Sequence, residues 1–130
     1  MINEEPSKSL SDPQERIDQV DQDCFIVSYH WTNEQNQHTF LYLNFTKKTL
    51  ADGQIFLVQS NVDSSEVKGQ GQQLWLFMVD KIDQIAKKGI NNQPPLPIVL
   101  EIHPNQYSRH LVESQANFHK KGDTYYGLFQ

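Results

Sequence analysis

Three runs rich in hydrophobic residues, separated by polar segments, are typical of β-strands. The runs are Cys24 to Trp31, Thr39 to Phe45 and Gln54 to Val62. They are rich in the β-branched and aromatic residues that strands favour. Short polar or turn-like segments, Thr32 to His38 and Ala51 to Gly53, separate them. The pattern therefore predicts an antiparallel meander of three strands.

After the third run the period of the apolar residues changes. They recur every three or four positions, at Leu74, Met78, Ile82 and Ile85. This spacing is the stripe of an amphipathic helix. Two lysines then suit the negative end of the helix dipole, and Gly89 is a natural stop. We predict a helix over Gln70 to Lys88.

The last third of the chain predicts a strand, a helix and a strand. A proline-rich linker, Asn91 to Pro97, precedes the apolar run Ile98 to Ile102, which is typical of a buried strand. Tyr107 to Lys120 has a weaker helical stripe, and Thr124 to Phe129 resembles a closing strand. The predicted fold class is a mixed α/β or α+β layer structure with a largely antiparallel sheet flanked by helices.

The first 23 residues differ from the rest in charge. They hold seven acids and two bases, whereas residues 24–130 hold nine of each, so the net charge of −5 belongs to this segment. Ser11 to Glu15 suits the start of a short helix, because Asp12 can cap it and Pro13 fits its first turn. We expect residues 1–23 to form an acidic, flexible extension ahead of a single domain over residues 24–130.

Composition narrows the classes of function. Hydrophobic residues make up 37% of the chain, enough for a folded core. A neutral body lacks the basic face of a duplex nucleic-acid binder. No segment approaches the roughly 20 apolar residues of a membrane span, and the acidic start does not resemble a signal peptide. With Cys24 as the single cysteine, no intrachain disulfide can form. We expect a cytoplasmic protein with no nucleic-acid or membrane partner.

The histidines of the C-terminal third do not have a zinc spacing. His103, His110 and His119 are separated by six and eight residues, and no cysteine lies near them. We therefore predict no metal site.

A loop with two glycines, Gly69 and Gly71, joins the third predicted strand to the long helix. The first amides of a helix have no intrahelical acceptor, the helix dipole is positive there, and glycines let a phosphate approach the backbone. The loop lacks the Gly-Lys-Ser/Thr ending of a Walker A motif. Leu74 also stands where a dinucleotide-binding fingerprint requires a third glycine. A plain strand-to-helix turn without a ligand remains the alternative.

The passage from Asn61 to Leu74 resembles the loop and helix of the GNAT superfamily of N-acetyltransferases, particularly its short single-domain members. The similarity extends over about residues 25–120 and includes Phe40 to Phe45 and Gly53 to Val58, but only the loop and helix are specific. The resemblance implies a GNAT-like acyl-CoA acyltransferase fold that uses acetyl-CoA as a substrate.

The resemblance also implies where acetyl-CoA binds. Its pyrophosphate would lie on the amides of the loop, and its pantetheine arm would pair with the strand edge near Gln59 to Val62. The implied cofactor-binding residues are Asn61, Val62, Val67, Lys68, Gly69, Gln70, Gly71, Gln72 and Gln73.

Acyl transfer to an amine needs a base for the amine proton and a donor for the oxyanion. Glu101 is the candidate base, His103 is an alternative base, and Tyr107 is a candidate donor of a proton to the leaving thiolate. The implied acceptor is an amine of a small molecule or a protein, and a homodimer is compatible with the sequence.

A second class of function stays open. Glu66 occupies the loop position that is usually Gln or Arg in the family, and no clear catalytic dyad is visible. These features favour a non-catalytic GNAT-like module that binds CoA or a protein partner, with the acidic tail as its contact segment.

Overall fold

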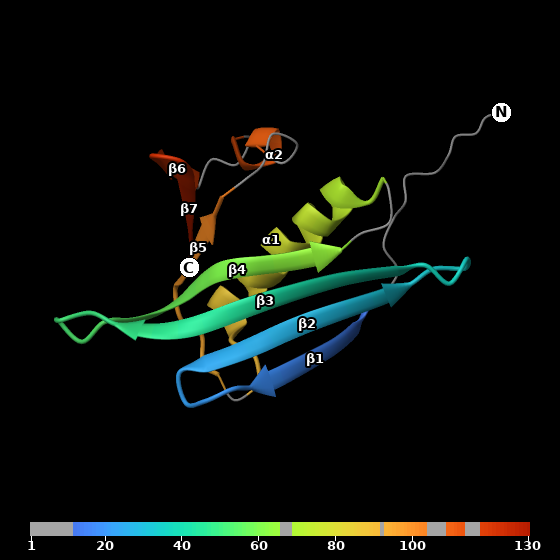
Figure 1. Cartoon of the computed structure of the whole chain (residues 1–130). Coiled ribbons are helices and arrows are strands. Elements are labelled where there is room, and N and C mark those ends of the chain that lie inside the picture. Colours follow the sequence, from blue (N-terminus) through green and yellow to red (C-terminus); the bar gives the residue numbers. More distant parts are fainter. Residues whose placement is uncertain (1–11, 66–68, 92, 104–108, 114–117) are drawn as a thin grey trace.

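The described part of the chain is an α+β fold built on one sheet (Figure 1). The computed structural model describes residues 12–65, 69–91, 93–103, 109–113 and 118–130. Its elements, in chain order, are β1 (Gln14–Gln19), β2 (Cys24–Thr32), β3 (His38–Thr49), β4 (Ile55–Ser65), α1 (Gly71–Lys88), β5 (Ile98–Ile102), α2 (Arg109–Glu113), β6 (Phe118–Lys121) and β7 (Thr124–Phe129).

Seven strands of the described residues form the sheet, in the order β1-β2-β3-β4-β5-β7-β6. Every neighbouring pair is antiparallel except β4 and β5, which are parallel. A parallel pair needs a crossover connection, and α1 lies in that connection. The predicted meander, now β2 to β4, and the mixed, largely antiparallel sheet are confirmed.

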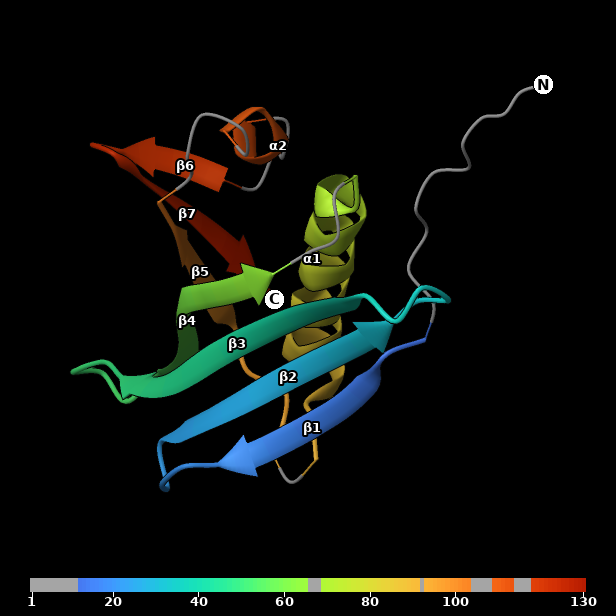
Figure 2. The same cartoon turned by 45° about the vertical axis from the view of Figure 1, so that its right-hand side comes forward.

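The helix α1 covers one face of the sheet (Figure 2). Its buried residues are those of the predicted stripe together with one alanine: Leu74, Met78, Ile82, Ile85 and Ala86. The helix ends at Gly89, whose φ is 76° and whose N–H donates to the carbonyl oxygen of Ile85 at 2.9 Å. A Cβ atom at this glycine would lie 2.2 Å from the carbonyl oxygen of Gln93, so only glycine fits.

The core lies between α1 and the strands. Every second residue of β2 and β3 is buried there, in four cross-strand pairs: Phe25 with Phe45, Val27 with Leu43, Tyr29 with Leu41, and Trp31 with Thr39. Because successive side chains of a strand point to opposite faces, the residues between them lie on the face away from α1. We call this the outer face.

The prediction of a flexible N-terminal extension is wrong for residues 14–19, and residues 1–11 lie outside the described residues. Residues Gln14–Gln19 form β1, which pairs antiparallel with β2 at the edge of the sheet. Gln14 and Glu15 thus belong to a strand, although the sequence predicted the start of a helix there. An isolated short helix is only marginally stable in water, whereas the edge of β2 offers a full set of backbone partners. The sheet therefore begins ahead of residue 24.

The helix predicted over Tyr107 to Lys120 is wrong at its C-terminal end. Among the described residues the helix α2 covers Arg109–Glu113, and Phe118–Lys121 forms the strand β6. The ring of Phe118 lies over Gly127 of β7, where an added Cβ would come within 2.6 Å of it. Residues 118–121 thus form a strand because they pair with β7 and because the Phe118 ring packs on Gly127.

Candidate functional site

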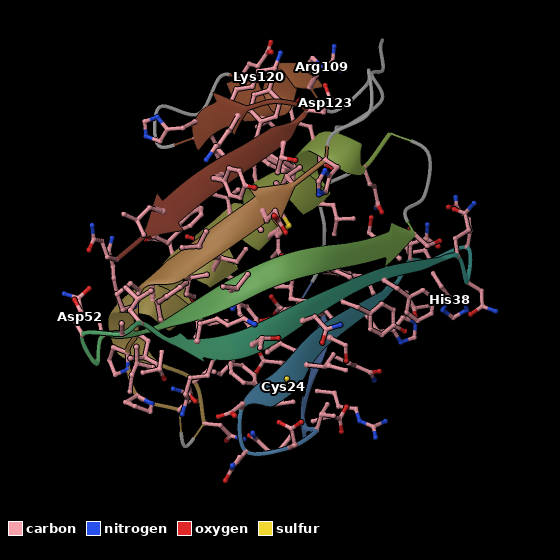
Figure 3. The ribbon with its side chains drawn as sticks, turned by 60° about the vertical axis from the view of Figure 1, so that its left-hand side comes forward. Cys24, His38, Asp52, Arg109, Lys120 and Asp123 are labelled. Carbon is pink, nitrogen blue, oxygen red and sulfur yellow. The ribbon has the colours of Figure 1, made fainter. Side chains whose placement is uncertain are left out.

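The candidate site lies where the parallel strands β4 and β5 separate. Their pairing covers only Leu57 with Ile98, Val58 with Val99, and Gln59 with Leu100. Beyond this point β4 continues to Ser65 beside β3, and β5 continues beside β7. Figure 3 shows the two strands diverging from their common start. In the part of the chain that the structure describes, β4 has no strand partner on its β5 side after Gln59.

A β-bulge coincides with this separation. Phe45 of β3 pairs with Gln59 of β4, but the preceding Asn44 pairs with Asn61, which leaves Ser60 as an extra residue on β4. A bulge bends the strand that carries it and increases its twist. The bulge therefore turns the last part of β4 away from the direction of β5.

The glycine loop brings the chain from the end of β4 to α1. Gly69 has a φ of 92°, in the region that favours glycine. The side chain of Gln70 is buried at 6% exposure, and the hydroxyl of Thr39 donates to its Oε1 at 2.7 Å. Its carbonyl oxygen accepts the N–H of Leu74 at 2.9 Å. Gln70 thus fixes the start of α1 to β3 and leaves the helix without a side-chain cap.

The first two residues of α1, Gly71 and Gln72, are exposed. Gln73 is partly buried, and the first turn contains no acidic residue. The N–H groups of these three residues precede the first intrahelical bond, and the helix dipole adds partial positive charge around them. This end of the helix can accept an anion. The phosphate site stays a prediction.

The structure describes most of the residues assigned to acetyl-CoA. Asn61 and Val62 lie on β4 just beyond the bulge, opposite Asn44 and Leu43 of β3. Gly69 and Gln70 form the loop, and Gly71, Gln72 and Gln73 begin α1. The remaining predicted site residues, Val67, Lys68 and the catalytic candidate Tyr107, lie outside the described residues.

The two described catalytic candidates lie at the end of β5. Glu101 is half-buried and pairs with Tyr126 of β7. His103 follows the strand, is exposed, and has its Nδ1 3.2 Å from the hydroxyl oxygen of Thr124. With a strand period of two, Glu101 and His103 face the same side, away from the buried Leu100. They therefore lie on the outer face, after the paired part of β5, and Asn61 and Val62 follow the paired part of β4.

At Gln59, the sequence could not predict that the buried side-chain amide has no hydrogen-bond partner. Its side chain is 0% exposed, and neither its Nε2 nor its Oε1 has a hydrogen-bond partner. Strand alternation with the buried Leu57 could have indicated that it points inward. No local pattern reports that its amide is unpaired. Gln59 pairs with Leu100 in the last pair of β4 with β5, so it lies where the two strands separate.

The part of the chain that the structure describes limits the kinds of site. No three or more His, Cys, Asp or Glu residues gather there in a way that could hold a metal ion. Among the described helices, none combines the length and the apolar character that crossing a bilayer requires.

These observations define the class of the protein as an α+β fold with a mixed, mostly antiparallel open sheet and a separated parallel strand pair. No protein-family model, curated protein or solved structure matches the chain.

Proposed function

We propose that the protein has a GNAT-like acyltransferase fold and is an N-acetyltransferase that moves an acetyl group from acetyl-CoA to an amine of a small molecule or protein. One observation carries the proposal. A parallel strand pair separates after three paired residues, and the strand β4 then leads through Gly69 into the uncapped start of α1. This arrangement offers an open strand edge and an anion site on one continuous segment.

The orientation of acetyl-CoA follows from these two parts. Its pyrophosphate binds the amides of Gly71 to Gln73, and its pantetheine arm runs back along β4 from Ser65 toward Gln59, a path of about 20 Å at the usual rise of a strand. The amides of the arm pair with the open backbone edge of β4, as an added strand would. The buried Gln59 closes the inner end of the path, which favours an acyl group as small as acetyl.

Acyl transfer would then occur at the separation of the strands. The amine nitrogen attacks the thioester carbonyl carbon, the C–S bond breaks, the amine proton passes to a base, and the thiolate takes up a proton. His103 suits the role of base because Thr124 holds its Nδ1 and leaves the other ring nitrogen to the reaction. Glu101 on the same side is the alternative base. Tyr107 remains the candidate donor to the thiolate.

Thermal unfolding with acetyl-CoA tests the binding part of the proposal. A ligand at a hundred times its Kd should stabilise the folded state by about 2.7 kcal/mol. Gly69→Val should remove this stabilisation, because a β-branched residue is strained at positive φ and obstructs the loop. Gly53→Val is the matched control, since Gly53 also lies in an exposed turn, at a φ of 89°. The control should keep the full effect of acetyl-CoA.

Absence of stabilisation at millimolar acetyl-CoA would contradict the proposal. Equal losses in the two glycine variants would show that the loop has no special role and would also contradict it. Release of free CoA in the presence of amines separates the two classes of function. Stabilisation without release would favour the non-catalytic module that binds CoA.

A further inference from the structure

A second group of polar side chains lies far from the strand separation, beside the turn between β2 and β3. His30 lies on β2 and is half-buried, whereas His38 begins β3 and is exposed. Figure 3 labels His38 at this end of the hairpin, on the opposite side of the view from Asp52. His30 pairs with Phe40 and His38 pairs with Thr32, so the two histidines are diagonal neighbours on the outer face.

Three donor atoms converge in this group. The Nε2 of His30 and the Nδ1 of His38 are 2.8 Å apart, and the hydroxyl oxygen of Thr32 is 3.4 Å from each of them. Ligands at the usual metal–nitrogen distance of about 2.1 Å are separated by about 3.0 Å at right angles and about 3.4 Å at tetrahedral angles. The observed spacing is therefore close to that of metal ligands, and each ring must turn by about 35–45° so that its lone pair points to the ion.

The surroundings hold the two imidazoles in place. The ring of His30 stacks on Phe40 with centroids 4.5 Å apart and planes within 5°, and it meets His38 edge to edge through the contact between Nε2 and Nδ1. The adjacent turn is closed by Asn33, whose Oδ1 accepts the N–H groups of Gln35 and Gln37 at 2.9 Å. Phe40 and the closed turn thus hold the two imidazoles near each other before a metal arrives, which reduces the ordering that binding requires.

We propose that His30, His38 and Thr32 form a site for a divalent transition-metal ion, which we call the hairpin site. The two imidazole nitrogens are the main ligands, the Thr32 hydroxyl is a weak third ligand, and water completes the coordination. Without metal, one imidazole N–H donates to the other ring. On binding, that imidazole carries its proton on its other ring nitrogen, so both converging nitrogens present lone pairs.

The ligand set determines which ions bind. Imidazole suits Cu²⁺, Ni²⁺ and Zn²⁺, and affinity rises toward Cu²⁺ in the order that divalent first-row metals generally follow. Mg²⁺ and Ca²⁺ prefer oxygen ligands and should not compete. The hairpin site lies on the outer face and shares no residue with the proposed acetyl-CoA site. Each of the two proposals can therefore be correct without the other.

Calorimetric titration of the full chain with ZnCl₂ tests the hairpin site. We expect one site, and a loss of affinity of about tenfold or more in His30→Asn and in His38→Asn, because each removes one of two nitrogen ligands. His119→Asn is the matched control, since His119 is exposed on β6, and should bind as the wild type does. MgCl₂ should give no heat of binding.

Paramagnetic Cu²⁺ locates the ion independently of any variant. In two-dimensional amide NMR spectra, substoichiometric Cu²⁺ should first broaden the signals of residues 30–40. Zinc binding that survives both histidine variants, broadening centred elsewhere in the chain, or no binding of either ion would overturn the proposal.

Discussion

At the scale of single residues, Gln59 has the most unusual environment of the described core. Its side chain is completely buried opposite Phe45 and Leu100, yet both ends of its amide are unpaired. An unsatisfied buried polar group costs about 1–3 kcal/mol of stability. Such a group marks a place where the fold is not at its stability optimum.

Replacing Gln59 by leucine should therefore raise the free energy of unfolding, by about 1–3 kcal/mol, because leucine fills a similar space without an unpaired amide. Urea denaturation measures this change. Gln72→Leu on the exposed side of α1 is the control and should stay within about 0.5 kcal/mol of the wild type. A clear loss of stability in Gln59→Leu would mean that the amide is hydrogen-bonded in solution.

At the scale of elements, α1 is the only long helix among the described elements. It packs on the sheet through one stripe of apolar residues. Ile82 on this stripe is 0% exposed, whereas Leu76 on the other side is 51% exposed. Tertiary packing of an apolar face, rather than helix propensity, usually provides most of the stability of such a helix. The contribution of each leucine or isoleucine should therefore depend on its side of α1.

Ile82→Ala should lower the free energy of unfolding by about 2–5 kcal/mol, since it leaves a cavity beneath the helix. Leu76→Ala removes a similar side chain from the exposed side and should cost less than about 1 kcal/mol. Chemical denaturation of the two variants compares them directly. Similar losses in both would contradict the observed orientation of α1.

At the scale of the whole molecule, two buried tyrosines lie beside carboxylates that other elements supply. Burial raises the pKa of the Tyr29 phenol, and the neighbouring carboxylate of Glu15 on β1 raises it further. Near the other edge, the hydrogen bond from the Tyr125 hydroxyl to Glu113 raises the pKa of Tyr125. In both cases the carboxylate that raises the pKa of the tyrosine lies on another element.

The raised pKa of Tyr29 predicts a loss of stability at alkaline pH. The unfolded phenol releases its proton near pH 10, whereas the folded one keeps it, so the contribution is complete below about pH 10 and declines as pH rises further. The decline approaches about 1.4 kcal/mol per pH unit. Denaturation at pH 8 and at pH 11 measures it.

Tyr29→Phe should lose less stability than the wild type between these two pH values, because its side chain cannot ionise. Tyr42→Phe is the control, since Tyr42 is 42% exposed on the outer face, and should follow the wild type. If Tyr29→Phe and the wild type lost the same amount, the alkaline loss would have another source.

Local patterns predicted the elements that depend on a single segment. The helical stripe from Leu74 to Ile85 and the apolar run Ile98 to Ile102 correspond to α1 and β5. Gly89, the predicted stop, ends the helix through its positive φ. Where neighbouring residues alone determine the conformation, the period of hydrophobic residues is sufficient.

Pairing between separate segments determined the elements that the local patterns did not predict. β1 contains few apolar residues and is a strand because the edge of β2 lies beside it, and β6 is a strand because β7 and Gly127 do. Of the candidate site, the glycine loop and the start of α1 were visible in the sequence. The separation of β4 from β5 depends on a bulge and on partners in other strands.

The sequence by itself determined the helix, most strands and the face of each that is buried, because these follow from the spacing of apolar side chains along one segment. Only the tertiary structure decided that Gln59 is sealed without partners and that His30 and His38 meet beside Thr32. Such contacts depend on strand register and on side-chain packing between segments, which the spacing of residues within one segment does not record.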